Sequence, residues 1–206
     1  MKNIVTKFYS KILVFILVLI VFSFCKQKPA EIKTSQRWGK FTIDSKISKN
    51  EIFKKLDNEK EKFSAFERDT LMRKTSDVAY INNQNPSYDI KKYSKINNCR
   101  AYFWKKDTLS IKIGIGNGFT GRGFIILIKN NEFYTEPYYS TDVIIEGEKK
   151  SVYKIIYQKL TLNKLNLKIG DSIYGKIDFK SIETDNQNKV ISHTGLGYFR
   201  TKVKEL

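Results

Sequence analysis

The fold of this chain is decided by residues 108–129, where Thr108-Leu-Ser-Ile-Lys-Ile-Gly-Ile115 is followed, after a short glycine-rich stretch, by Gly123-Phe-Ile-Ile-Leu-Ile-Lys129. In the first run, apolar side chains occupy every second position, and polar or small residues lie between them. A period of two places the apolar side chains on one face of an extended strand. The second run is apolar on both faces, which favours a strand inside a sheet. The two runs therefore predict two β-strands joined by a turn.

Runs of the same kind continue on both sides of this stretch. Asn130-Asn131 leads into Glu132-Phe-Tyr-Thr135, and asparagine tolerates the positive φ of a tight hairpin turn. Further strands are expected at Asp77–Ile81, Ala101–Trp104, Asp142–Glu146, Val152–Leu162, Ser172–Phe179 and Tyr198–Val203. Many short strands with short connections predict a mainly β fold, an antiparallel β-sandwich or barrel, over residues 97–206.

An amphipathic helix is expected before the β-domain, within residues 48–96. Ser48-Lys-Asn-Glu51 fits the S-x-x-E capping box, so the helix should begin at Ser48. Apolar side chains then recur near a 3.6-residue period, with charged side chains mostly opposite them. These apolar residues are Ile52, Leu56, Phe63 and Phe66. The helix is predicted to pack on the core, with a membrane-surface helix as the alternative, and residues 25–47 are predicted to form a polar tether.

The first 24 residues have the layout of an export signal. Lys2, Lys7 and Lys11 precede an apolar run that extends from Ile12 to Phe24. At ~1.5 Å per residue this run spans only ~20 Å, which is short of the ~30 Å hydrocarbon core of a bilayer. A permanent transmembrane anchor is therefore the weaker interpretation, and residues 1–24 are predicted to be a signal peptide.

The apolar run ends at Cys25, and a polar stretch follows. This arrangement resembles the lipobox of bacterial lipoproteins, over residues 1–25 alone, and the rest of the chain is similar to uncharacterised cell-envelope lipoproteins. The resemblance implies that Cys25 carries a diacylglycerol thioether and becomes the first residue of the mature chain. The family usually has a small residue before the cysteine and an aliphatic one three before it, where this chain has Phe24 and Phe22. A cleaved signal that releases a soluble protein and an uncleaved anchor remain as alternatives.

The charge of the chain limits its partners. Among 206 residues, 38 Lys and Arg against 21 Asp and Glu give a net charge of +17, and removal of residues 1–24 takes away three lysines and leaves +14. Only 6 of the basic residues are Arg, the side chain whose planar fork reads phosphates and bases. No nucleic-acid partner is therefore expected. The lysine excess instead favours an anionic surface polymer, anionic lipid headgroups or a protein partner.

Residues with catalytic or metal-binding chemistry are few. Cys99 has no cysteine partner if Cys25 carries lipid, and it is expected to be a buried thiol on a strand. His193 is the single histidine, so a zinc site lacks ligands, and neither a metal nor a cofactor is predicted. His193 beside Ser192 could serve a hydrolase, but no G-x-S-x-G accompanies it. A structural histidine is the preferred interpretation.

A glycine cluster joins the two decisive runs and contains a literal G-x-G-x-x-G at Gly116, Gly118 and Gly121. A dinucleotide site requires a helix after this motif, whereas a strand is expected here, so a turn between strands is the preferred interpretation. If the β-domain binds a ligand, we predict the loop with these three glycines and Arg122 as the place.

Aromatic residues form a second candidate, because Phe133–Tyr139 and Trp104 could stack on a sugar. Core and edge packing is the preferred interpretation, since aromatic residues alternate along the strands of many β-folds. Pro137 lacks a backbone N–H and is therefore expected at a sheet edge or strand end.

These features together predict an exported lipoprotein of the cell envelope, anchored to the inner or outer membrane and facing the periplasm or the exterior. Secretion as a soluble protein is the alternative. The β-domain is predicted to be a non-enzymatic binding or interaction module. Two other functions stay open: a barrel-like carrier of a small apolar ligand, and an envelope hydrolase that uses His193.

Overall fold

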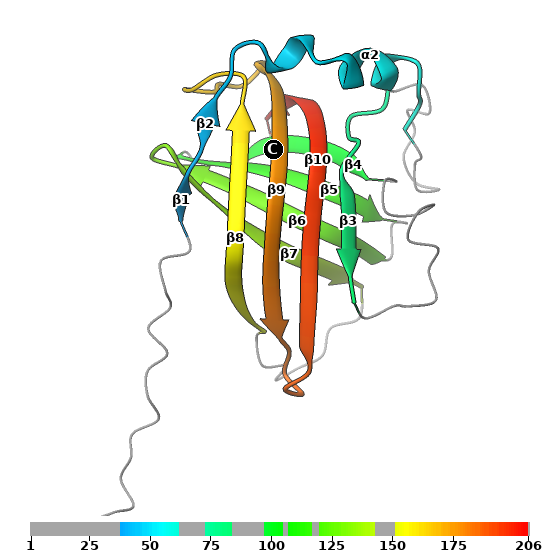
Figure 1. Ribbon diagram of the computed structural model, residues 1–206, viewed down its shortest axis with the longest axis vertical. Coiled ribbons are helices and arrows are strands. Elements are labelled where there is room, and N and C mark those ends of the chain that lie inside the picture. Colours follow the sequence, from blue (N-terminus) through cyan, green and yellow to red (C-terminus); the bar gives the residue numbers. More distant parts are fainter. Residues whose placement is uncertain are drawn as a thin grey trace, which may run out of the picture. The chain divides into compact units, whose positions relative to one another are not determined.

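The computed structural model describes residues 38–61, 73–83, 97–104, 107–116, 120–142 and 151–205 (Figure 1). The strands are β1 (Gly39–Lys40), β2 (Thr42–Ile43), β3 (Ala79–Asn82), β4 (Asn98–Trp104), β5 (Thr108–Gly116), β6 (Thr120–Lys129), β7 (Glu132–Thr141), β8 (Val152–Leu162), β9 (Ser172–Thr184) and β10 (Val190–Lys204). The helices among the described residues are the 3-10 helix η1 (Ile47–Lys49) and the α-helix α2 (Glu51–Asp57). The prediction of a mainly β fold with one α-helix near its start is confirmed.

Several predicted features lie outside the described residues. They are the signal peptide, Cys25, Phe63, Phe66, Gly118 and most of the predicted strand Asp142–Glu146. The predictions that rest on these residues therefore stay predictions.

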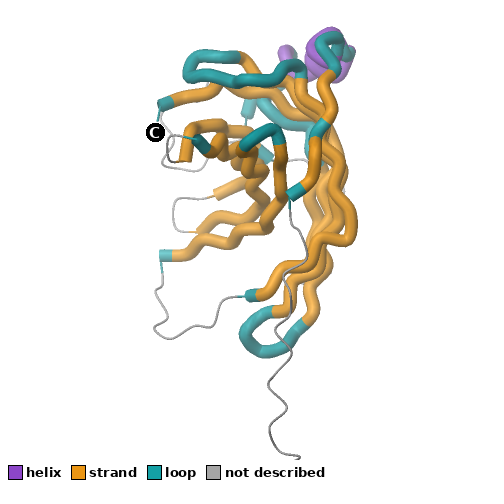
Figure 2. Tube along the Cα trace, turned by 90° about the vertical axis from the view of Figure 1, so that its left-hand side faces the viewer, coloured by secondary structure: helices purple, strands orange, loops and turns teal. Residues whose placement is uncertain are grey.

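The strands lie in two layers that share β10 (Figures 1 and 2). The order of hydrogen-bonded neighbours is β1-β7-β6-β5-β4-β10-β9-β8-β2, and β3 pairs with β10 off this path. In Figure 1, β8, β9 and β10 run side by side, and β5, β6 and β7 cross behind them. β1 and β2 stand at the two ends of the order, yet only Phe41 separates them along the chain. The chain thus links the first strand to the last, as a sandwich closed toward a barrel requires.

β10 reaches both layers because it is long and changes partners. Residues 190–202 pair with β9 along one edge, while on the other edge residues 193–196 pair with β3 and residues 203–204 pair with β4. The β4–β10 pair and the short β2–β8 pair are parallel, and the other strand pairs are antiparallel. Each parallel pair joins segments far apart in the sequence, because strands that run the same way need a long connection.

The core lies between the layers and consists of the positions that alternate with period two. Ile111 and Ile113 of β5 are fully buried, as the period-two pattern predicts. On β6, Phe124 and Ile126 are fully buried, whereas Ile125 and Leu127 on its other face are half-buried. The four fully buried residues belong to one contiguous cluster with side chains from β4, β8, β9 and β10. Burial of each such side chain contributes about 1.5–3 kcal/mol to the free energy of folding. The largest fully buried side chains of this cluster are Phe124, Phe133, Phe179 and Phe199.

Two local predictions about the strands are confirmed. The β6–β7 hairpin turns at Asn130 and Asn131, whose φ values of 51° and 61° are those of a turn with two left-handed residues. Cys99 is a free thiol on β4 without exposed surface. Burial raises the pKa of this thiol far above its usual range, so a reactive thiolate does not form there.

A side chain helps to close the seam between β7 and β8. Gln158 of β8 accepts hydrogen bonds from the backbone N–H and the hydroxyl of Thr135 on β7, at 3.0 and 3.1 Å. Its amide also donates to the Phe133 carbonyl at 3.4 Å. β1 pairs with β7 only up to Phe133, so the glutamine satisfies the next N–H along the edge. Pro137 lies beyond this point in β7, where no described strand needs its N–H, which confirms its predicted edge position.

The helix differs from its prediction in length and start. Asn50, rather than Ser48, caps α2, because its side chain accepts a hydrogen bond from the Ile52 N–H at 3.0 Å. The residues around Ser48 form η1 instead. The buried side chains of α2 are Phe53 and Leu56, and the Phe53 ring packs edge-on against Tyr174 at 5.0 Å between centroids. The helix therefore covers the outer side of β9 and β10 near one end.

Candidate functional site

The described glycines of the cluster lie on the paired strands β5 and β6, and packing requires glycine at Gly114 and Gly123. Gly116 and Gly121 form the last β5–β6 pair, and β6 follows at once, so the helix of a dinucleotide site is absent from these described residues. A Cβ at Gly114 would lie 2.3 Å from the Tyr138 hydroxyl, and one at Gly123 would lie 2.2 Å from the Ile113 carbonyl oxygen. Close approach of the backbones and of Tyr138 thus explains Gly114 and Gly123 without a ligand. The ligand loop with Gly116, Gly118, Gly121 and Arg122 stays a prediction.

The predicted aromatic residues do not share one surface. Phe133 is fully buried in the core, and Tyr134 is buried against Trp38, with ring centroids 5.3 Å apart. Trp104 and Tyr139 are exposed, but Trp104 pairs with Thr108 at one end of β5, whereas Tyr139 pairs with Arg122 near the other end of that layer. A single sugar-stacking platform is therefore not formed by these residues.

His193 lies in a buried hydrogen-bonded network. Its Nε2 is 2.8 Å from Glu183 Oε2, and its Nδ1 is 2.8 Å from the Tyr80 hydroxyl. The Tyr153 hydroxyl donates to the other oxygen of Glu183 at 3.3 Å. Because the carboxylate accepts the Nε2 proton, Nδ1 is an acceptor and Tyr80 donates to it. Both ring nitrogens of His193 are thus engaged within the protein.

This network has the order acid, histidine, hydroxyl, but it lacks an activated nucleophile. Burial, with the Glu183 charge adding to the effect, raises the pKa of Tyr80 far above its usual range, so its hydroxyl stays protonated. Ser192, the neighbour considered for a hydrolase, points to the opposite side of β10 from His193, because side chains alternate along a strand. Ser181 is paired with His193 across the strands, and its buried hydroxyl has no hydrogen-bond partner within the described residues. The arrangement supports a structural histidine.

The network predicts a pH dependence of stability. Burial lowers the pKa of His193 below its ordinary value of 6.5 more than the Glu183 hydrogen bond and charge raise it. The unfolded chain therefore binds the proton more readily, and the free energy of unfolding should fall as the pH drops below about 6.5 toward the lowered value. One proton limits the slope to about 1.4 kcal/mol per pH unit.

The measurement is urea unfolding of the protein and of its His193→Gln variant between pH 7.5 and pH 5. The variant keeps a polar side chain without the titration, and it should show the flatter pH profile. Equal slopes in the two proteins would contradict the assignment of this pH dependence to His193.

Lysines and exposed apolar side chains share the outer side of β8, β9 and β10, a surface that we call the basic face. The alternation of each strand turns one set of residues inward and the other outward. Asp178 is the one acidic residue in the outward set. The outward lysines are Lys154, Lys159, Lys176, Lys180, Lys202 and Lys204. The exposed apolar residues of the face are Val152, Ile156, Tyr157, Val190 and Leu196.

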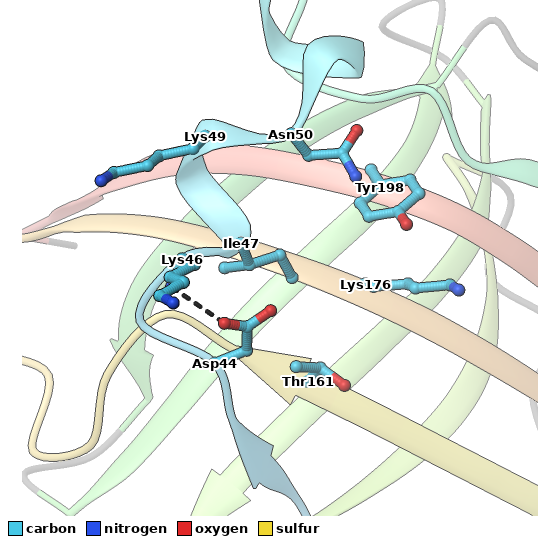
Figure 3. A pocket seen from close by; sticks show the side chains of 8 residues that line it. All are labelled: Asp44, Lys46, Ile47, Lys49, Asn50, Thr161, Lys176 and Tyr198. Atoms are coloured by element: carbon cyan, nitrogen blue, oxygen red, sulfur yellow. Dashed lines mark hydrogen bonds between the residues drawn. The ribbon is translucent and has the colours of Figure 1, made fainter.

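A cleft of about 440 Å³ opens at the end of the basic face near η1 (Figure 3). It is lined by Asp44, Lys46, Ile47, Lys49, Asn50, Thr161, Lys176 and Tyr198. Asp44 is held by the Lys46 backbone N–H at 2.9 Å, and the Lys176 ammonium lies over the Tyr198 ring, 5.4 Å from its centroid. Figure 3 shows Lys49 and Lys176 pointing to opposite sides, so their charges do not converge on one point. The cleft thus extends the positive surface and does not enclose a single anion.

Sequence reasoning missed two of these features. Asp185-Asn-Gln-Asn188 has the composition of a turn, and strands that pair on both sides of such a turn place Glu183 diagonal to His193. Nothing in the sequence pattern placed Tyr80 there. The lysines of the basic face stand at alternate strand positions, but their alignment depends on the register of three strands.

The described residues hold neither a cluster of metal ligands nor a helix that could span a membrane. Within the described ranges, no three His, Cys, Asp or Glu side chains lie together as a metal site would need. Of the helices in the described part of the chain, none has the length and apolar character needed to cross a membrane. Comparison of the chain with protein-family models, with curated proteins and with solved structures found no match.

Proposed function

We propose that this chain is an exported, lipid-anchored protein of the cell envelope, and that its β-domain is a non-enzymatic binding module for an anionic partner. The observation that carries the proposal is the basic face. Among the described residues its lysines form no ion pair, and apolar side chains lie exposed among them. A surface that is both basic and apolar suits contact with an anionic partner better than simple solvation.

The anchor in this proposal is a lipid on Cys25. Two or three acyl chains hold a soluble domain on a membrane almost permanently, whereas one chain gives only reversible binding. Cys99 cannot take this role, because it is buried on β4. The proposal of a non-enzymatic role is supported by the His193 network, in which the potential nucleophile Tyr80 is held protonated.

The anchor is tested by mass spectrometry of the full chain expressed in a bacterial host and fed an alkyne-labelled palmitate. The expected result is a mature N-terminus at Cys25 that carries the diacylglycerol thioether, with labelled protein in the membrane fraction. Cys25→Ala should abolish the label almost completely, whereas Cys99→Ala should retain it. An unmodified mature chain that begins at Lys26 would refute lipidation.

A further inference from the structure

We infer that the anionic partner of the basic face is the membrane surface itself, on which the anchored β-domain lies with β8, β9 and β10 against anionic phospholipid headgroups. The inference rests on the proposed function and names the partner of that same face. The apolar side chains, the unpaired lysines and the place where the chain enters the domain each support it.

The apolar side chains of the face are arranged for contact with a lipid interface. A β-bulge between Ile155 and Tyr157 leaves Ile156 and Tyr157 both exposed, by 47% and 43%. On β10, Val190 and Leu196 are exposed by 59% and 54%. Side chains of this kind enter the boundary between headgroups and acyl chains, and lysine stems can lie along it with their ammonium groups in water. A purely hydrophilic acidic polymer would leave the apolar side chains without a role.

The charges of this face differ from those of the opposite layer. Lys154, Lys159 and Lys180 make no ion pair within the described residues. On the other layer, by contrast, Lys129 pairs with Asp107 at 2.6 Å and Arg100 pairs with Glu61 at 2.6 Å. Among the outward basic residues of β8–β10, Arg200 pairs with Asp57, whereas Lys154, Lys159 and Lys180 leave unpaired positive charge on this face. Each lysine near an anionic bilayer strengthens binding by a factor of about five.

The form of the face favours an extended anionic surface over a single small anion. Lys159 and Leu196 flank Asp178 in one row across the sheet, and Tyr157 pairs with Lys180 in the next row. Apolar and charged groups are thus mixed over three strands. The cleft adds lysines at one end of the same face, but their ammonium groups diverge.

The proposed anchor also lies within reach of the face. The chain from Cys25 to Trp38 can extend to at most ~45 Å. It enters the domain at β1 and β2, and β2 pairs with β8 at the edge of the basic face. A lipid on Cys25 therefore permits the domain to lie on its β8–β10 side.

The inference is tested by photo-crosslinking of the full chain on lipid vesicles. A photoreactive phenylalanine analogue is placed at Leu196 on the basic face or at Trp104 on β4, two positions that are each 54% exposed. Vesicles contain phosphatidylcholine alone or phosphatidylcholine with phosphatidylglycerol, and lipid adducts are counted by mass spectrometry. With phosphatidylglycerol we expect severalfold more lipid adducts at position 196 than at position 104. Added salt should reduce this ratio, because it screens exposed charges.

Two triple variants with the same net charge test whether the lipid adducts at position 196 depend on the lysines of the basic face. Lys154→Glu, Lys159→Glu and Lys180→Glu together should bring the adducts at position 196 down to the level at position 104. Lys40→Glu, Lys60→Glu and Lys168→Glu change the net charge equally at exposed positions outside β8–β10 and should leave the ratio unchanged. Unfolding curves of both variants verify that the fold is retained.

The outcomes separate the anchor from the docking surface. A chain that stays on the vesicles but gives equal adducts at both positions overturns the docking inference alone. The docking inference is also overturned if the ratio of adducts at position 196 to those at position 104 is the same with and without phosphatidylglycerol. It is overturned too if this ratio falls equally with both triple variants. A chain that leaves vesicles of both compositions contradicts the anchor and the docking together. In intact cells, protein adducts in place of lipid adducts at position 196 would assign the face to a protein partner instead.

Discussion

Phe179→Ala is expected to lower the free energy of unfolding by about 4 kcal/mol, because the ring is fully buried and its removal leaves a cavity. The Phe179 ring lies between the two layers, 4.7 Å from Phe124 and 6.5 Å from Tyr80 between ring centroids. For a chain of this size the midpoint of thermal unfolding should fall by roughly 8–16 °C. Tyr139→Ala removes an aromatic side chain that is 72% exposed and should change stability by less than about 0.5 kcal/mol.

Gly195 provides a second test of the packing around the Phe179 ring. It pairs with Phe179 across β9 and β10, and a Cβ there would lie 2.3 Å from the Phe179 Cε1 atom. Gly195→Ala alone should therefore destabilise the protein by about 1–3 kcal/mol through overpacking. In the Phe179→Ala background the new methyl group occupies vacated space, so the same change should stabilise by about 0.5 kcal/mol.

Urea unfolding of the two single variants and the double variant measures this coupling. A change of sign for Gly195→Ala between the two backgrounds is the expected result. Additive effects of the two substitutions would mean that the ring does not cover Gly195.

β5 could be predicted from the sequence because its side chains follow the period-two pattern, and β6 because its run is apolar on both faces. β5, β6 and the turn at Asn130 and Asn131 lie where the pattern indicates. β9 was expected to end at Phe179, yet it continues to Thr184. The inward positions beyond Phe179 are Ser181 and Glu183, which face the His193 network. Because these last inward residues of β9 are polar, the alternation of apolar residues stops before the strand ends.

Short strands that depend on distant partners could not be predicted. β1 and β2 lie within residues 25–47, which the sequence presents as a polar tether, and they are extended because β7 and β8 supply their hydrogen bonds. The start of β10 was missed in a similar way, since Gly195 and Gly197 interrupt its apolar pattern. Gly195 is acceptable in a strand here because the Phe179 ring covers it. Pairing across the sheet, not local propensity, decides these segments.

The candidate site shows a similar division between local and long-range information. The glycine cluster is conspicuous in the sequence, but at Gly114 the demand for glycine comes from Tyr138 and the neighbouring backbone. The basic face is inconspicuous, because its lysines are spread over three strands. Only the register that aligns Lys159, Asp178 and Leu196 reveals that positive and apolar groups share one surface.

Glu61→Ala should lower the free energy of unfolding by about 2 kcal/mol, because it removes the buried acceptor of charged hydrogen bonds from the part-buried Arg100. The Glu61 side chain has no exposed surface, and its two carboxylate oxygens accept hydrogen bonds from Arg100 at 3.0 and 2.6 Å. The same carboxylate accepts the hydroxyl of Thr75, and the Thr75 oxygen in turn accepts the Cys99 backbone N–H at 2.8 Å. The pair therefore fixes the segment before β3 onto the edge of β4.

The exposed pair between Arg73 and Asp57 provides the matched comparison, with a separation of 3.4 Å and side chains that are 72% and 41% exposed. Arg73→Ala should cost less than about 1 kcal/mol, because water screens such pairs. Glu61→Gln keeps hydrogen-bonding capacity without the charge and should fall between the two. Chemical unfolding of the three variants decides the matter: if Glu61→Ala costs no more than Arg73→Ala, the Glu61–Arg100 pair does not hold this segment on the sheet.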